Sequence, residues 1–394
     1  MTNASNVNLT TPFGSVGLHR RPIGSLGDLR AFDGADQLLL ETVGRVQADG
    51  ATGRVLVVGD NFGALAVSVR HVSPTSWSDS AVTHLATKSN LAAQNDATVV
   101  RLVVDDRELV GPFDIVMWRI PRAVRVLRYQ AAVLQRLMSN DSVVLAGGMD
   151  KHLPPDARTI LEGLGLVHTH PGARKAHVFQ VRPDLTLPAL QPLSLPVVAV
   201  PQYALTLHGG HQSFSPDRVD LGARVMASAL ATMSPTERIA DLCCGGGILG
   251  IVAQQHQPTA VVHYFDESFS AIETARANVA ANAPAPVGRE SQFHWTDGMD
   301  AYDGDAFDAV VCNPPFHQDG AVTDAVSWHL FNEARNHLAP GGQLWVVGNR
   351  HLGYHLKLRR LFGNCVQVAS HPKFVVLAAE RALRPVRANV RLNI

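Results

Sequence analysis

The chain has 394 residues, of which 46% are hydrophobic and 17% are charged, and its formal net charge is zero. This length and composition indicate a globular protein with two domains. A net charge of zero excludes a global positive field that would draw the chain onto nucleic acid, so any such binding must use local patches. No apolar run approaches the roughly 18 residues of a membrane span, and the polar first residues lack the pattern of a signal peptide. We therefore expect a cytoplasmic protein without membrane contact.

Both halves of the chain alternate short strand patterns with longer helical patterns. The strands of the first half read "RVLVVG", "FDIVMW" and "SVVLAGG", and those of the second half read "RIADLCC", "AVVHYFD", "FDAVVCN" and "GQLWVVG". This alternation is typical of βαβ units with a mostly parallel sheet. The sequence therefore predicts an α/β protein with two tandem Rossmann-like domains.

The two halves also repeat each other. Gly63 aligns with Gly247, Asp79 with Asp266, and "FDIVMWRIPR" with "FDAVVCNPPF". The offsets of the matched positions drift only from 184 to 194 residues, which indicates an internal duplication. We predict a first domain at 18–182, a proline-rich linker and extended segment at 183–209, a second domain at 210–383 and a basic tail at 384–394.

The four cysteines all lie in the second half and form no C-x-x-C pair: Cys243, Cys244, Cys312 and Cys365. Neither a metal site nor a disulfide framework is predicted from this spacing. We expect reduced cysteines that serve as small core residues.

A glycine-rich loop, "DLCCGGGILG" at residues 241–250, follows a strand and begins a helix in the second half. Its glycines allow a tight turn and a close approach to a ligand, and its amides can bind a polar group. The predicted cofactor contacts in this loop are Asp241, Cys243, Gly245 and Gly247. The steric demands of a tight turn also explain such glycines, so the loop alone does not establish a ligand site.

Two acidic residues follow the next strands. Asp266 lies 19 residues after Gly247, where a carboxylate can accept both hydroxyls of a ribose. Asp297 ends the following strand and can accept an adenine amino group. The alternatives are a helix cap for Asp266 and an ordinary turn for Asp297. Together with the loop, the two acids predict a nucleoside pocket along the carboxyl edge of the sheet.

Asn313, Pro314, Pro315 and Phe316 follow the fourth strand as "NPPF". The prolines restrict the backbone, so that the Asn313 side-chain oxygen and the Pro314 carbonyl can accept hydrogen bonds from one exocyclic amine. Such acceptors orient a poorly nucleophilic amine beside the cofactor, which Asn313 is also expected to contact. Phe316 offers a face for base stacking. The alternative is that the motif only terminates the strand.

These residues resemble the class I S-adenosylmethionine-dependent methyltransferases, and "NPPF" is similar to the signature of members that methylate exocyclic or amide nitrogens. The two-copy architecture is similar to the ribosomal RNA guanine-N2 methyltransferase family. The segments "LRAFDGADQLLL", "AVTDAVSWHLFNEAR" and "KFVVLAA" resemble the member acting on the large ribosomal subunit more than its small-subunit relative. The resemblance implies methylation of N2 of one guanine in 23S ribosomal RNA, with S-adenosylmethionine as the cofactor and no metal; we expect a monomer.

The resemblance also assigns roles by position. Gly245 and Gly247 would line the methionine moiety, Asp266 the ribose, Asp297 the adenine, and residues 313–316 the guanine. The segment 214–226 is similar to the one that covers the cofactor in this family. The family loop has glycine where this chain has Cys243, whose small side chain fits if φ there is negative.

Two basic clusters are candidate phosphate contacts for RNA: Arg119, Arg122, Arg125 and Arg128 in the first half, and Arg350, Lys357, Arg359 and Arg360 in the second. The alternative is that they are solvated helix faces. In the first copy Arg119 stands where the second has Asn313, and Asn61 and Phe62 replace loop glycines. We therefore predict a degenerate first domain that holds RNA.

Other functions stay open from the residues alone. A protein glutamine or DNA adenine N-methyltransferase also uses Asn-Pro-Pro followed by an aromatic residue, and a small-subunit ribosomal RNA enzyme has the same architecture. A catalytically silent RNA-binding assembly factor is the alternative from another class; the intact Asn313, Pro314 and Asp266 argue against it.

Overall fold

The computed structural model describes residues 7–22, 29–50, 52–95, 97–212, 217–282, 290–315 and 320–383, apart from the side chains of 7 and 320–323. The chain divides into two compact units. Unit 1 comprises Met1–Pro196, Gly209–Pro216 and Glu267–Ser270, and unit 2 comprises Val197–His208, Asp217–Asp266 and Ala271–Ile394.

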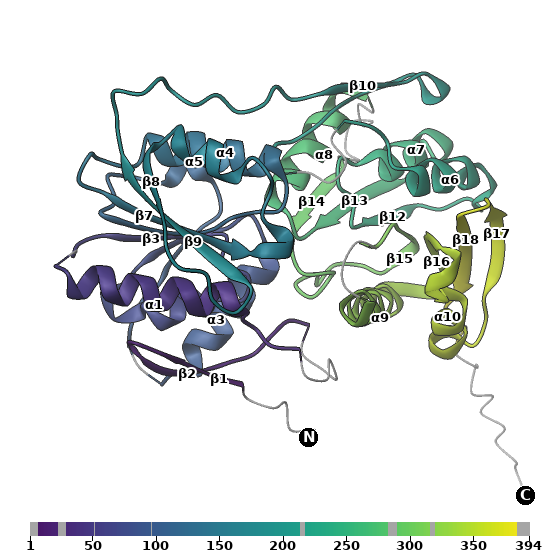
Figure 1. Ribbon diagram of the computed structural model, residues 1–394. Coiled ribbons are helices and arrows are strands. Elements are labelled where there is room, and N and C mark those ends of the chain that lie inside the picture. Colours follow the sequence, from purple (N-terminus) through teal and green to yellow (C-terminus); the bar gives the residue numbers. More distant parts are fainter. Residues whose placement is uncertain are drawn as a thin grey trace, which may run out of the picture. The chain divides into compact units, whose positions relative to one another are not determined.

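Unit 1 is built on a seven-stranded sheet with the order β5-β4-β3-β6-β7-β9-β8 (Figure 1). Its strands are β3 (Val55–Val58), β4 (Thr75–Trp77), β5 (Arg101–Val103), β6 (Ile115–Arg119), β7 (Val143–Met149), β8 (Gly165–Thr169) and β9 (Ala176–Pro183). The pairs from β5 to β7 are parallel, and β9 runs antiparallel to both β7 and β8. A separate hairpin joins β1 (Val7–Thr11) to β2 (Gly14–Leu18).

The helices of unit 1 cover both faces of this sheet. They are α1 (Gly34–Ala48), α2 (Ala64–Ser68), α3 (Ala81–Ala92), α4 (Val124–Gln135) and α5 (Ala157–Glu162). Leu39 of α1 and Val67 of α2 belong to the core on one face, and Leu127 of α4 and Leu161 of α5 belong to the core on the other. Figure 1 shows α1 on the opposite side of the sheet from α4 and α5.

Unit 2 repeats the same strand order as β14-β13-β12-β15-β16-β18-β17. Its strands are β12 (Arg238–Leu242), β13 (Val261–Asp266), β14 (Gln292–Trp295), β15 (Phe307–Cys312), β16 (Leu338–Asn349), β17 (Val366–Ser370) and β18 (Phe374–Glu380). Neighbours from β14 to β16 are parallel, and β18 is antiparallel to β16 and β17. A hairpin of β10 (Val197–Val200) and β11 (Leu205–His208) begins this unit and lies within the segment 183–209.

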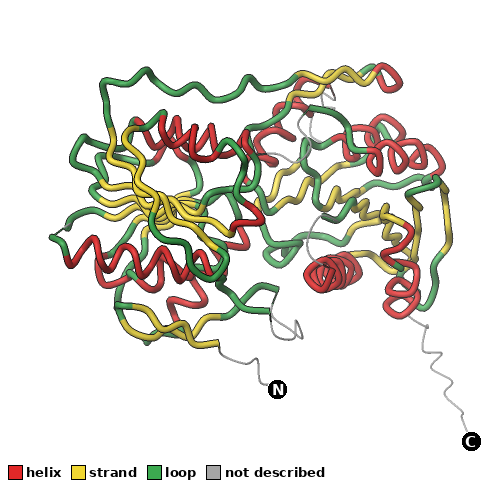
Figure 2. The backbone as a smooth tube through the Cα atoms, viewed as in Figure 1, coloured by secondary structure: helices red, strands yellow, loops and turns green. Residues whose placement is uncertain are grey.

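The helices of unit 2 are α6 (Leu221–Ala229), α7 (Ile248–His256), α8 (Phe269–Asn282), α9 (Gly320–His337) and α10 (Tyr354–Phe362). Because side chains alternate along a strand, Ile239 and Ala240 of β12 face opposite cores. The first core contains residues of α6, α7 and α8, and the second contains residues of α9 and α10. Figure 2 shows these helices on the two sides of the strands.

The two matching sheets confirm the prediction of two Rossmann-like α/β domains, since each sheet is mostly parallel and has helices on both faces. In unit 2 the chain first builds outward from β12 through β13 and β14, and then returns to add β15 on the other side. Ligands of such sheets bind at the carboxyl ends of the strands beside this reversal. Within the ranges that the structure describes, no helix has the length and apolar character to cross a membrane.

Candidate functional site

The loop between β12 and α7 contains three residues with a left-handed backbone. Their φ angles are 62° at Cys243, 53° at Gly245 and 83° at Gly247. A Cβ atom added to Gly247 would lie 3.2 Å from the Cβ of Ala275, so this glycine lets α8 pack closely against the loop. A Cβ atom added to Gly245 would meet no atom of the described residues within 4 Å. The loop therefore leaves open space beside the glycine that was predicted to line a cofactor.

The condition stated for Cys243, a negative φ, is not met. Its φ is 62°, and the matching position of the first copy is Gly59, whose φ is 71°. Both loops are therefore left-handed at this position, and only the first has glycine there. A left-handed backbone costs a residue with a Cβ atom about 1 kcal/mol. Cys243 therefore preserves the loop conformation at a cost in stability.

Asp241 is fully buried below this loop. Its Oδ2 accepts a hydrogen bond from the backbone N–H of Gly250 at 2.7 Å, which ties β12 to the first turn of α7. Its Oδ1 has no partner among the residues described, and burial raises the pKa of this carboxyl to about 7. Asp241 thus holds the loop and helix together, and its predicted contact with a cofactor stays a prediction.

Asp266 ends β13 and lies directly beside the glycine loop. Its Oδ2 accepts a hydrogen bond from the backbone N–H of Gly245 at 2.8 Å. The fold therefore brings together two residues that are 21 positions apart and that were predicted to hold adjacent parts of one nucleoside. This contact also fixes the carboxylate at the carboxyl edge of the sheet, where a ribose would bind.

Asp297 follows β14 and is 6% exposed. Its Oδ1 lies 3.4 Å from Nε2 of His329 on α9. Although burial opposes it, the Asp297 carboxylate raises the pKa of His329. The ligand atoms of these two residues and of Asp300 lie within 4.8 Å of one another. Carboxylates and imidazoles gather in this way without an ion, and we assign no metal to them.

Asn278 on α8 is a site residue to which the sequence analysis gave no role. Its Nδ2 donates to the carbonyl oxygens of Gly246 at 2.9 Å and His208 at 3.0 Å, and its Oδ1 accepts from the N–H of His208. Asn90 makes the same three contacts in unit 1, with Phe62 and His19. Asn90 and Asn278 lie at corresponding positions of the duplicated sequence. This correspondence was the signal from which a shared contact with the loop could have been predicted.

Asn313 follows β15, whose last residue Cys312 pairs with Leu242 at the end of β12. This register places Asn313 at the sheet edge next to the glycine loop. Its Oδ1 is buried and has no partner among the residues described, whereas its Nδ2 donates to Oδ2 of Asp220 at 3.5 Å. Pro314 is buried and Pro315 is exposed. Phe316 lies outside the described residues.

A buried acceptor without a partner costs about 1–3 kcal/mol. In a native structure such an atom requires an explanation, and a ligand that supplies the missing donor is one. The Oδ1 atom of Asn313 fits a donor such as an exocyclic amine. The site can therefore hold a nucleoside along Gly245 and Asp266 while presenting an acceptor to a second molecule.

The structure argues against the predicted phosphate contact of Arg119. Its side chain is 11% exposed, and its guanidinium binds both Asp33 oxygens, at 2.7 and 2.9 Å, and lies 3.3 Å from Asp36. Although burial opposes it, the Asp36 and Asp33 carboxylates raise the pKa of Arg119. Its charge is thus compensated inside unit 1 by Asp33 and by the buried Asp36, and the buried Asp36 would lose its cation if Arg119 turned outward to a phosphate.

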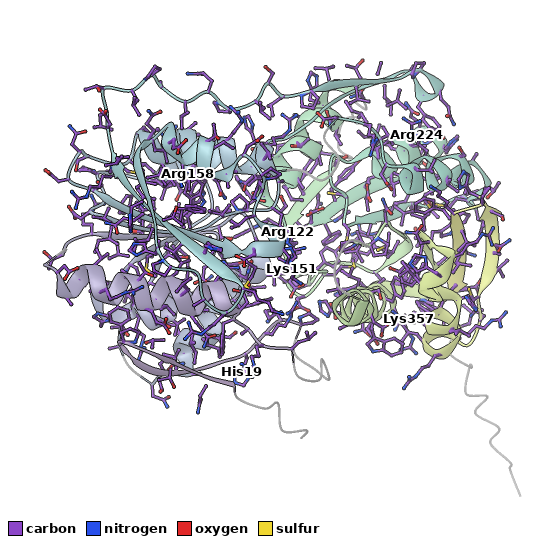
Figure 3. The ribbon with its side chains drawn as sticks, in the orientation of Figure 1. His19, Arg122, Lys151, Arg158, Arg224 and Lys357 are labelled. Carbon is purple, nitrogen blue, oxygen red and sulfur yellow. The ribbon has the colours of Figure 1, made fainter. Side chains whose placement is uncertain are left out.

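The other basic residues of the first cluster lie nearer the surface. Arg122 is exposed, and its Nη2 lies 2.7 Å from Nε2 of His152. Arg125 is partly exposed and donates to the carbonyl oxygen of Ser194 at 2.7 Å. Figure 3 labels Arg122 and, close to it, Lys151, which precedes His152 in the chain. Arg122 therefore stays the best candidate of this cluster for a phosphate contact.

The second cluster also contains both a largely buried residue and exposed ones. Lys357 is 13% exposed and binds Asp324 Oδ1 at 2.6 Å and Ser327 Oγ at 2.6 Å (Figure 3). Arg360 is exposed, with its guanidinium 5.2 Å from the ring centre of Trp328. Arg350 is exposed and donates to the carbonyl oxygen of His371. Lys357 thus braces α10 against α9, while Arg350 and Arg360 face solvent; the basic tail lies outside the described residues.

The fold and the glycine loop define a methyltransferase of the class I type, and comparison with known proteins agrees. The methyltransferase small domain matches residues 204–378, and the RLMG N-terminal domain matches residues 6–185. The 16S ribosomal RNA N2 methyltransferase of T. thermophilus, solved with AdoMet and guanosine, superposes with a TM-score of 0.76 at 19% identity, over 95% of this chain and 97% of that chain.

Sequence relatives then give the family. The ribosomal RNA large subunit methyltransferase G of Stutzerimonas stutzeri is 40% identical over 95% of this chain and 99% of that protein. The protein of the same name from Streptomyces avermitilis is 37% identical over 95% of this chain and 99% of its own length. The chain belongs to the ribosomal RNA large subunit methyltransferase G family, which confirms the predicted resemblance.

Proposed function

We propose that the chain transfers a methyl group from S-adenosylmethionine to the exocyclic N2 amine of a guanine in the large-subunit (23S) ribosomal RNA. The observation that carries this proposal is the buried Oδ1 of Asn313, at the strand end beside the glycine loop, which has no partner among the described residues. Membership of a family whose relatives are named for the large-subunit RNA supports the choice of substrate.

The residues of unit 2 fit S-adenosylmethionine. The open space above Gly245 suits the methionine moiety, and the Asp266 carboxylate beside it suits the ribose hydroxyls. Asp297 is assigned to the adenine end. The bound cofactor supplies an electrophilic methyl group. The protein contributes a loop that hydrogen bonds from Asp266 and Asn278 hold in place, and a set of acceptors that orient the guanine.

Asn313 and Pro314 have the direct role toward guanine in this proposal. The N2 amine is conjugated to the ring and is therefore a poor nucleophile. The Asn313 Oδ1 and the Pro314 carbonyl oxygen accept its two N–H groups, which aims the nitrogen lone pair at the methyl group. Pro315 restricts the backbone that presents these acceptors, and Phe316 is assigned to stacking on the base.

In this proposal the two predicted domains have different roles. The first domain, 18–182, and the tail, 384–394, bind RNA, while the domain at 210–383 carries the chemistry. Arg122, Arg125, Arg350 and Arg360 are the proposed phosphate contacts, because they are at least partly exposed in unit 1 or unit 2. We further propose that the protein acts as a monomer in the cytoplasm on naked or partly assembled RNA.

The test is a comparison of ribosomal RNA from cells that lack this gene and cells that express it. We expect N2-methylguanosine at one position of the 23S RNA to disappear on deletion and to return with the wild-type chain, as read by mass spectrometry of RNA fragments. Expression of Asn313→Ala serves as the matched control and should not restore it. Loss of a modification from the 16S RNA instead would replace the substrate, and no loss from either RNA would overturn the proposal.

A further inference from the structure

The start of α6 carries a carboxylate that reaches the proposed acceptor. Asp220 is the N-cap residue of α6, and its Oδ2 accepts from the backbone N–H of Ala223 at 3.3 Å. The same Oδ2 lies 3.5 Å from Nδ2 of Asn313, which donates to it. A single oxygen atom of Asp220 therefore accepts hydrogen bonds from α6 and from Asn313, the residue that follows β15.

This contact decides which way the Asn313 amide points. An ionised carboxylate only accepts hydrogen bonds, so the NH2 end of the asparagine must face Asp220. The carbonyl end then points the other way, and its Oδ1 is the atom that has no partner among the described residues. If the amide were reversed, two oxygens would face each other and the guanine amine would meet another N–H group.

The packing of α6 holds the carboxylate in this place. Val219 and Ala223, on either side of it, belong to the hydrophobic core of unit 2. A Cβ atom added to Gly222 would lie 2.9 Å from Oδ2 of Asp220 and 3.2 Å from a ring carbon of Phe374. The absence of a side chain at position 222 therefore leaves room for the carboxylate beside the core.

The first unit repeats this contact with different chemistry. Asp33 is the N-cap residue of α1, which precedes the central strand β3 as α6 precedes β12. Its carboxylate binds the guanidinium of Arg119, at the position that the duplication aligns with Asn313. In both units, an aspartate at the start of this helix meets the residue at the end of the fourth strand. The duplicated fold therefore has a contact between the helix start and this strand end in both units.

We propose that Asp220 is a positioning residue for methyl transfer, which sets the Asn313 amide so that its oxygen faces the guanine N2 amine. This inference rests on the proposed function. It goes beyond helix capping, because capping uses only the bond to Ala223, whereas positioning needs the bond to Asn313.

Three variants separate the two roles. Asp220→Ser keeps a good N-cap but is too short to reach Asn313, Asp220→Asn keeps the cap and the length, and Asp220→Ala removes both bonds. Initial rates would be measured with purified full-length protein, S-adenosylmethionine and ribosomal RNA extracted from cells lacking the gene. Thermal unfolding and S-adenosylmethionine titration would be recorded for each variant.

We expect Asp220→Ser to lower kcat about 10-fold to 100-fold, as misplaced reacting groups do, with an unchanged midpoint of unfolding and unchanged affinity for S-adenosylmethionine. Asp220→Asn should recover most of the rate, because its amide oxygen can still accept from Asn313. Asp220→Ala should lose the rate and also unfold at a lower temperature.

A wild-type rate in Asp220→Ser would overturn the inference and leave only the capping role. The inference would also be overturned if Asp220→Ser lowered the midpoint of unfolding as much as Asp220→Ala does, because the loss of kcat would then follow from a weakened helix start. If the wild-type chain itself formed no N2-methylguanine, the proposed function would fail, and that outcome is visible before any variant is compared.

Discussion

At the residue scale, Cys243 and Arg119 depart from what their positions in the sequence indicate. Cys243 takes a left-handed backbone that glycine takes in the first copy, and Arg119 is enclosed by carboxylates although its neighbours suggested an RNA-facing row. Neither outcome could be predicted. The sequence does not fix φ at one loop position, and the partner of Arg119 lies 86 residues earlier in the chain.

The backbone of Cys243 leads to a stability prediction that can be checked with paired substitutions. We expect Cys243→Gly to be more stable than Cys243→Ala by about 1 kcal/mol, because only alanine places a Cβ atom on a left-handed backbone. The measurement is the free energy of unfolding in urea. At Cys244, which is not among the residues with positive φ, the order should reverse, since glycine there only loosens the unfolded chain. The same order at both positions would contradict the left-handed turn.

At the scale of elements, the strand ends were the predictable part of the site. Parallel strands place their carboxyl ends at one edge, so the sequence alone could bring the loop, Asp266 and Asn313 together, and the register of β12 with β15 agrees. The contacts that hold these groups were not predictable in detail. Asn278 and Asp220 act through hydrogen bonds to distant segments, at separations of 32 and 93 residues, and hydrophobic periodicity carries no information on them.

The junction of α1 and β6 allows a second prediction, on Arg119 and Arg122. We expect Arg119→Met to lower the free energy of unfolding by about 3 kcal/mol, because it leaves the buried Asp36 and the partly exposed Asp33 without their cation. Arg122→Met should leave stability within about 0.5 kcal/mol and weaken RNA binding. The measurements are urea unfolding and filter binding of ribosomal RNA. A stable Arg119→Met variant with reduced RNA affinity would restore the phosphate contact.

The same junction makes the stability of unit 1 depend on pH. Burial raises the pKa of Asp36 to about 7, well above its value in an unfolded chain. Between about pH 4 and pH 7 the folded state therefore binds more protons than the unfolded state, so the free energy of unfolding falls as pH rises through this range. Arg119→Met should extend that fall to higher pH, because the Arg119 charge lowers the pKa of Asp36 and its removal lets that pKa rise further. A flat profile in both proteins would contradict the buried cluster.

At the scale of the whole molecule, the two units share one strand order but differ at the ends of the matching strands β6 and β15. Among its described residues, unit 2 has open space at Gly245 and an acceptor without a partner at Asn313. Unit 1 has Asn61 and Phe62 in the matching loop, and Arg119 and its carboxylates fill the matching strand end. The duplication and the fold were predictable because repeats and strand patterns are properties of the sequence. The ion pairs of Arg119, which occupy the matching strand end in unit 1, could be found only from the structure.

Cofactor binding and methyl transfer are assigned to unit 2 alone, and Asn313 acts in the transfer step. The most direct test of this assignment is one pair of assays on purified wild-type and Asn313→Ala protein: calorimetric titration with S-adenosylmethionine and methyl transfer to ribosomal RNA from cells lacking the gene. We predict a single S-adenosylmethionine per chain, bound with similar affinity by both proteins, and a transfer rate at least about 100-fold lower in Asn313→Ala, as when reacting groups are misplaced. Transfer by Asn313→Ala at the wild-type rate, or two cofactors bound per chain, would contradict the account.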